Sequence, residues 1–174
     1  MRKGKKLIVA GICAVICSAM MFELVGACGT LKAYAAEGQI QINDKNFPDK
    51  EFRSYVAEFD TDKNGYLSGA EIENVTDIKV SGKGIGSLQG IEFFTALEFL
   101  WCYENNLSSL DVSKNTALKW LNCDKNNLDS LDVSKNTALT SLDCGGNNLS
   151  SLDVSKNKAL TRPFQVLCKL KNLI

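Results

Sequence analysis

LEFLWCYENNLSSLDVSKNTA at residues 97–117 is followed by LKWLNCDKNNLDSLDVSKNTA at 118–138 and LTSLDCGGNNLSSLDVSKNKA at 139–159. Aligned, these stretches share columns of identical residues 21 positions apart: Cys102, Cys123 and Cys144; Asn105, Asn126 and Asn147; Leu110, Leu131 and Leu152; Val112, Val133 and Val154. A fixed period of this length predicts stacked units, each of which buries its apolar face against its neighbours.

Each unit has two similar halves, because the spacing of Leu100, Cys102 and Asn105 returns ten residues later. In the first half we expect a short strand that points Leu100 and Cys102 inward, and stacking at about 4.8 Å joins such residues into one core. A buried asparagine can satisfy backbone groups where the chain bends away from the strand. We therefore interpret the column Asn105, Asn126 and Asn147 as a structural ladder.

The pattern LxxLxCxxNxL resembles that of the leucine-rich repeat family, with cysteine in place of the second strand leucine. The resemblance implies an α/β solenoid with short parallel strands over residues 76–162. Upstream, a less regular turn begins at Ile78-x-Val80, 22 residues before Leu100-x-Cys102. This spacing is similar to that of the repeats in internalin-like surface proteins.

The repeat pattern fails after Leu160, because Pro163 and Gln165 stand where leucine and cysteine are expected. Residues 163–174 are thus a degenerate last repeat or a C-terminal cap. A natural cap and a shortened longer array both fit this stretch.

The cysteine column is predicted to hold free core thiols. Equivalent Cβ atoms on neighbouring parallel strands lie near 4.8 Å apart, beyond the usual span of a disulfide. Clustered CxxC spacing of the kind that binds zinc is absent. Cys168 has lost the register, so the argument is weakest there.

Residues 60–71, DTDKNGYLSGAE, match the twelve-residue EF-hand loop at its diagnostic places. Gly65 supplies the turn, and the predicted calcium ligands are Asp60, Asp62, Asn64, Tyr66 through its carbonyl, Ser68 through water, and Glu71. The alternative is an Asx-rich turn that binds nothing. Ser68 and Glu71 also form a capping-box pattern, and the Glu71 carboxylate cannot fully serve both the cap and calcium.

Helices are predicted on both sides of this loop, which makes residues 37–75 an EF-hand-like helical cap. EF-hands usually work in pairs, and only one loop is visible, so we expect calcium to act as a static structural staple. The segments 42–49 and 90–95 resemble those of secreted bacterial leucine-rich repeat proteins that carry a single EF-hand before their repeats. That resemblance implies export and surface display, and no particular ligand.

Residues 1–36 are predicted to be a secretory signal peptide: a basic start, an uncharged apolar run over 7–22, and small residues at 33–36. The apolar run is shorter than a membrane-spanning helix requires. The alternative is a lipoprotein signal, in which Cys28 carries a lipid anchor. We expect a secreted or cell-surface protein in either case.

Outward strand positions flank the inward leucines and cysteines, and leucine-rich repeats bind partners through them. Aromatic residues gather at one end of these positions, at Phe99, Trp101, Tyr103 and Trp120. We predict that they form a contact surface for a protein or glycan, because exposed aromatic patches mark interaction sites. The alternative is that they pack beneath the helical cap or beneath further repeats.

No histidine occurs in the chain, which excludes Ser-His-Asp and Cys-His catalysis and every histidine-ligated metal site. Lysine plus arginine balance aspartate plus glutamate at 20 each, which argues against a nucleic-acid partner. We therefore expect a non-enzymatic, monomeric binding or adhesion module of a bacterial surface. The alternatives are a truncated structural fragment of a larger surface protein and an accessory domain of a secreted enzyme.

Overall fold

The structure of the protein is a computed structural model that describes residues 38–160. The chain divides into two units, Met1–Tyr34 and Ala35–Ile174, and the described residues all belong to the second. The predicted signal peptide, the lipidation candidate Cys28 and the degenerate stretch 163–174 therefore lie outside the described residues. Within 38–160, no helix has the length and apolar character that crossing a membrane requires.

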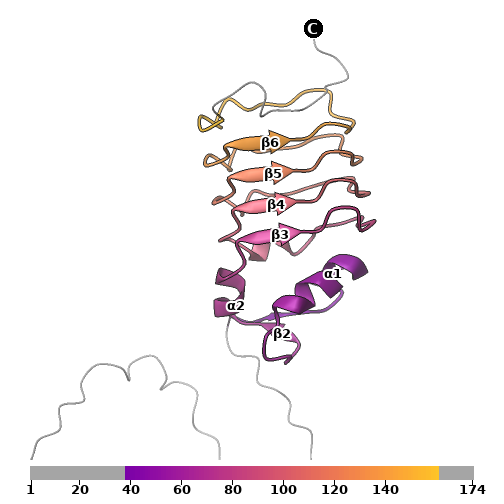
Figure 1. Cartoon of the computed structure of the whole chain (residues 1–174), viewed down its shortest axis with the longest axis vertical. Coiled ribbons are helices and arrows are strands. Elements are labelled where there is room, and N and C mark those ends of the chain that lie inside the picture. Colours follow the sequence, from indigo (N-terminus) through magenta and orange to yellow (C-terminus); the bar gives the residue numbers. More distant parts are fainter. Residues whose placement is uncertain (1–37, 161–174) are drawn as a thin grey trace, which may run out of the picture. The chain divides into compact units, whose positions relative to one another are not determined.

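Four short strands stack in chain order into one parallel sheet (Figure 1). They are β3 (Asp77–Lys79), β4 (Phe99–Trp101), β5 (Trp120–Asn122) and β6 (Ser141–Asp143). The register aligns Ile78 with Leu100, Leu121 and Leu142. The first interval is 22 residues and the next two are 21, as the sequence pattern predicts, and the leucine-rich repeat solenoid with parallel strands is confirmed.

The core runs through the stack as columns of equivalent apolar side chains. Leu100 and Cys102 are fully buried, as are their equivalents Leu121 and Cys123 one turn further on. The second half of each turn adds Val112 and its equivalents to the same core. Alternation along each strand thus leaves one face, which carries the residues beside the buried leucines, turned away from the core.

Two asparagine ladders join successive turns. Asn126 Nδ2 donates to the carbonyl oxygens of Cys102, one turn below, and Cys123 in its own turn, both at 3.0 Å, and its Oδ1 accepts from Leu107 N at 3.0 Å. Asn105 and Asn147 repeat this arrangement. A second ladder is formed by Asn115, Asn136 and Asn157, each of which donates to two carbonyls of the turn below.

The cysteine column is only partly as predicted. Cys102 and Cys123 are free and buried, and burial raises the pKa of the Cys102 thiol well above its usual range and that of Cys123 to about 12. Cys144 differs, because it is disulfide-bonded. The prediction of a free thiol is wrong there, because the strand spacing argues only against bridges between neighbouring turns of the column.

A small helical cap closes the first turn (Figure 1). It contains β1 (Ile40–Gln41), α1 (Lys50–Val56), the 3-10 turn η1 (Ala57–Phe59), β2 (Tyr66–Leu67) and α2 (Gly69–Glu73), and a second 3-10 turn, η2 (Ile91–Phe93), follows β3. Asp49 caps α1 by accepting from the backbone N–H groups of Glu51 and Phe52. Phe52 and Val56 then point into the apolar core.

The cap also satisfies backbone groups that the first turn of the solenoid would otherwise leave unpaired. Tyr55 Oη accepts from Lys79 N of β3 at 3.0 Å, and Asp49 Oδ2 accepts from Gly86 N at 2.9 Å. An unpaired sheet edge invites association with other chains, so these bonds cover the edge that faces the cap.

Gly90 fixes how the cap meets the repeats. Its φ of 101° lies in the left-handed region, and a Cβ added there would lie 2.2 Å from Cδ1 of Phe47 and 2.7 Å from the Asn46 carbonyl oxygen. Phe47 is fully buried and packs edge-on against Phe52 and Phe93. Neither the ring nor the backbone has room to move.

We expect Gly90→Ala to lower the free energy of unfolding by about 3 kcal/mol, from overpacking and from the left-handed backbone. Urea denaturation followed by circular dichroism measures this change. Gly69→Ala is the matched control, because a Cβ there meets nothing within 4 Å. It should change stability by less than about 1 kcal/mol, and equal midpoints for the two variants would contradict the packing argument.

Candidate functional site

The loop between η1 and α2 is held closed by its own acidic side chains. Asp60 is buried, and its two carboxylate oxygens accept from Asn64 N at 3.1 Å and from Gly65 N at 2.8 Å. Lys63 and Gly65 adopt left-handed backbone conformations, with φ of 57° and 85°, which reverse the chain within a few residues. The loop thus turns its oxygen atoms toward a common centre.

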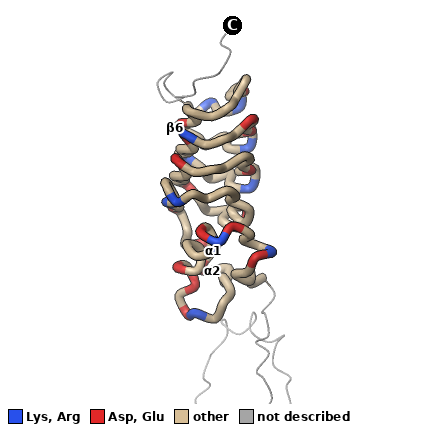
Figure 2. Tube along the Cα trace, turned by 90° about the vertical axis from the view of Figure 1, so that its right-hand side faces the viewer, with Lys and Arg blue, Asp and Glu red and all other residues tan. Residues whose placement is uncertain are grey.

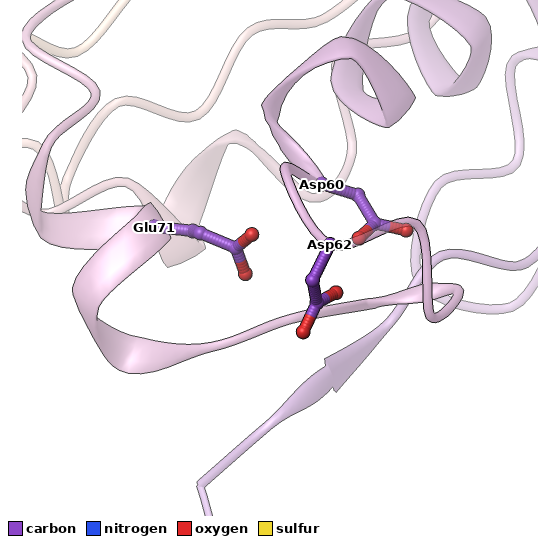
Figure 3. Close-up of side chains that lie close together, drawn as sticks. All are labelled: Asp60, Asp62 and Glu71. Carbon is purple, nitrogen blue, oxygen red and sulfur yellow. The ribbon is translucent and has the colours of Figure 1, made fainter.

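Three carboxylates meet in this loop (Figure 3). One oxygen from each of Asp60, Asp62 and Glu71 lies within 4.8 Å of the others. Of the other predicted ligands, Asn64 Oδ1 accepts from Tyr66 N at 2.7 Å, Tyr66 lies in β2, and Ser68 is the N-cap of α2. The structure therefore brings the carboxylates together, and calcium binding by them stays a prediction.

Glu71 is the most heavily bonded residue of the loop. Its Oε2 accepts from the N–H and hydroxyl of Ser68, both at 2.8 Å, and its Oε1 accepts from the N–H and hydroxyl of Thr61, both at 2.7 Å. These bonds, led by the one from the Ser68 backbone, lower the pKa of Glu71 to about 2. The carboxylate therefore stays ionised, and it links the two ends of the loop.

Thr61 helps to hold the Glu71 carboxylate, and the sequence analysis did not identify it. The EF-hand pattern leaves the second loop position unassigned, and no signal in the pattern marks it. Only the folded loop shows that Thr61 holds one oxygen of Glu71.

The short strand β2, within the loop, forms an antiparallel pair with β1. Ile40 pairs with Leu67 and Gln41 with Tyr66, and Ile42 N donates to Gly65 O at 3.0 Å. β2 lies within the predicted EF-hand loop, and β1 is its pairing partner. The single loop is therefore braced within its own chain.

An open pocket of about 540 Å³ lies beside the loop. Thr61, Asp62 and Glu71 line one part, and Thr76 and Asp77, at the start of β3, line another. The loop and the first strand of the repeat sheet thus share one hollow.

The second candidate site is the strand face, which we define as the outward side chains of β4, β5 and β6 together with the residue two positions past the end of each strand. The ring planes of Phe99 and Trp101 stack at 10°, with centroids 5.7 Å apart, and Lys79 Nζ lies 4.9 Å from the centroid of a Trp101 ring. Both rings are half-buried, whereas Tyr103 and Trp120 are 36% and 41% exposed.

The four aromatic residues of the strand face occupy adjacent places in it. The register pairs Phe99 with Trp120 across β4 and β5, and Tyr103 follows Trp101 past the end of β4. The prediction that they gather on one face agrees with this placement. Their role in binding stays a prediction.

These features define the class: residues 77–160 form a leucine-rich repeat solenoid that is closed at one end by a helix–loop–helix cap. No protein-family model matches the sequence. Over 88 residues, 50% of the chain, the sequence is 39% identical to Internalin J of Listeria monocytogenes serotype 4b, and the match covers 10% of that protein.

Solved structures of internalins are similar as well. The functional domain of InlJ from Listeria monocytogenes, described as including a cysteine ladder, matches with a TM-score of 0.56 and 31% identity over 78% of this chain and 35% of that one. The internalin inlF of the same species matches with a TM-score of 0.59 and 27% identity over 74% and 38% of the two chains. Internalin C2 of that species shares the fold at 17% identity, with a TM-score of 0.57, over 79% and 59%.

The chain is therefore similar to the internalins in sequence and fold, and it spans about a third of the InlJ and inlF structures it matches.

The ionisation of Glu71 gives a direct test of the loop geometry. Because its folded pKa of about 2 lies below the ordinary value of 4.5, the hydrogen bonds stabilise the fold above pH 4.5 and their contribution is lost as the pH falls through about 2. Thr61→Val removes one hydroxyl donor and should raise the pKa of Glu71, measured by carboxyl-carbon NMR in chelator. Thr95→Val, outside the loop, should leave it unchanged; a pKa near 4.5 in the unsubstituted protein would contradict the geometry.

Proposed function

We propose that the chain is a non-enzymatic, extracellular binding module that presents its strand face to a protein partner. The exposed aromatic side chains of that face carry the proposal, because Trp and Tyr dominate protein contact surfaces and are costly to leave in water. A curved array of parallel strands offers them on a rigid support. Similarity to the internalins supports a role at a bacterial surface.

Charge argues in the same direction. Figure 2 shows acidic and basic residues along the length of the stack, and the chain as a whole is balanced. A nucleic-acid partner would call for a concentrated basic surface. The alternative functions, a structural fragment of a larger surface protein or an accessory domain of a secreted enzyme, have no comparable feature in residues 38–160 to support them.

We further propose that calcium binds the loop and staples the cap. The donor set fits this ion: the side chains are oxygen donors, and carboxylates are the ligands that calcium prefers. Asp60, Asp62 and Glu71 would hold it, with Asn64, the Tyr66 carbonyl and water at Ser68. Glu71 would exchange some of its bonds to Ser68 and Thr61 for the ion, so the gain on binding is smaller than for an uncommitted carboxylate.

Calcium should raise the thermal stability of the protein. Extracellular modules bind it with dissociation constants of about 10⁻⁴ to 10⁻³ M, and calcium at about twenty times that value adds about 2 kcal/mol. Calorimetry in calcium and in chelator measures the difference. Glu71→Gln should abolish the response, whereas Glu73→Gln, an exposed neighbour on α2, should keep it. A melt that ignores calcium, or a Glu71→Gln variant that still responds, would rule out the staple.

The binding surface is tested with beads that carry the chain and are applied to cultured animal cells. Replacing Trp101 and Trp120 together with alanine should reduce bead retention at least about tenfold, because the central aromatic residues of an interface carry most of its energy. Lys114→Ala with Lys135→Ala, in the second half-turn, is the control and should leave retention unchanged.

Treating the cells before the assay separates the classes of partner. Protease treatment should remove retention, and glycosidase treatment should not. Circular dichroism of the alanine variant confirms that it is folded. Retention that survives both tryptophan substitutions would refute the strand face as the binding surface, and glycosidase-sensitive retention would point to a glycan.

A further inference from the structure

The strand face changes character from one rung to the next. On β4 and β5 it presents large rings, whereas on β6 its members are Ser141, Asp143 and Gly145. Ser141 is buried although it occupies an outward position, and Gly145 has no side chain. The aromatic surface therefore ends between β5 and β6, where the strand face drops from large rings to small side chains; we call this change the step. On the β6 side of the step, the largest side chain is the carboxylate Asp143.

Most charges around the strand face are already paired. Lys79 pairs with Asp77 at 3.5 Å, Lys119 with Glu98 at 2.7 Å, and Lys125 with Glu104 at 2.5 Å. The acids without an ion pair are Asp124, which is close enough to Lys125 to raise the pKa of that lysine, and Asp143. Within the described part of the chain, no lysine or arginine nitrogen lies within the 4.0 Å of an ion pair from either of these carboxylates.

Asp143 is in a costly environment for a charge. Burial raises the pKa of its carboxyl group above the ordinary value, and the negative charge of Asp124 raises it further. Its hydrogen-bond donor is Gly145 N at 3.2 Å, which lowers the pKa and only partly offsets the other two effects. A positive charge beside Asp143 would offset the cost of removing its carboxylate from water, and it would reduce the repulsion between the carboxylates of Asp143 and Asp124.

Resting on the proposed function, we propose that the strand face recognises a segment of the partner protein in which an arginine lies beside an apolar side chain. The guanidinium pairs with Asp143 and Asp124, and the apolar side chain packs on Trp120 and Trp101. The partner segment thus complements the strand face on both sides of the step between β5 and β6, with an apolar side chain on the rings and a positive charge at the carboxylates.

Arginine fits this place better than lysine does. Trp120 and Asp143 are one strand and two residues apart, which strand spacings convert to roughly 8 Å between Cα atoms. A guanidinium is planar, stacks on an indole and offers several N–H donors to carboxylates at once, whereas an ammonium is a compact, strongly hydrated charge.

Other occupants of the face fit less well. The three strands of this face, with three residues each, cover roughly 150 Å². This is far below the roughly 800 Å² per partner of a stable interface between folded proteins, so a dimer of this chain is disfavoured, whereas a short segment of a partner fits. A neutral sugar can bond to the carboxylates through its hydroxyl groups, but it leaves the repulsion between them in place.

The chain contains two tryptophans, Trp101 and Trp120, and both belong to the strand face. Their fluorescence therefore reports on this site alone. The purified chain is titrated to 50 mM with acetyl-Leu-Arg-Leu-amide, with its uncharged citrulline counterpart, and with lactose. The arginine peptide should give a saturable change in emission, and the citrulline peptide should bind at least about tenfold more weakly, since a charge-assisted bond is worth about 1.5 to 3 kcal/mol.

Asp143→Asn should reduce the affinity for the arginine peptide about tenfold, and Asp124→Asn should reduce it as well. Asp132→Asn makes the same change of charge at an exposed position in the second half-turn, and it should have no effect. Melting curves of all three variants establish that they are folded.

Equal responses to the two peptides, a response to lactose alone, or no response to any probe would each overturn the arginine assignment. The bead assay separates this failure from that of the proposed function. If retention still depends on Trp101 and Trp120 and on protease-sensitive cell proteins, the strand face remains the binding surface and only its preference for arginine falls.

Discussion

Every turn of this solenoid must find partners for backbone groups that its own short strand leaves unpaired, and the buried asparagines meet that need. Asn126 alone accepts one N–H and donates to three carbonyls in two turns. A buried backbone group without a partner costs about 1 to 3 kcal/mol. A turn without its asparagine would therefore bear this cost for each backbone group left unpaired. The parallel sheet, the cysteine column and the strand face all rest on this pairing.

The cap obeys the same requirement by other means. No turn precedes β3 within the described part of the chain, so Tyr55 and Asp49 take the place of a preceding ladder and pair with Lys79 N and Gly86 N. In the loop, the hydrogen bonds of Glu71 would compete with metal binding for the same carboxylate oxygens. The bonds that make it a helix cap are those that a metal ion would have to share, which ties the stability of α2 to whatever occupies the loop.

Much of this architecture follows from the sequence because identical residues return at a fixed interval. The register of Ile78 with Leu100, the inward leucines and the first asparagine ladder were predictable on that ground. The second ladder, at Asn115, had a signal in the ten-residue similarity of the half-turns, but its bonding did not follow from spacing alone. Features that occur once carry no such signal: the Tyr55 bond to β3, the hold of Thr61 on Glu71, the burial of Ser141 and the disulfide state of Cys144 depend on side chains brought together from separate segments.

The asparagine ladder also has an evolutionary consequence. Because the side-chain hydrogen bonds of Asn126 reach only its own turn and the one below, duplicating a 21-residue unit adds a new turn whose bonds are copies of existing ones. Such an array can lengthen or shorten in whole units without redesign of its interior, while the outward residues of each copy are free to diverge. The contrast between Trp120 on one rung and Ser141 on the next is what such divergence looks like when the scaffold beneath it is held constant.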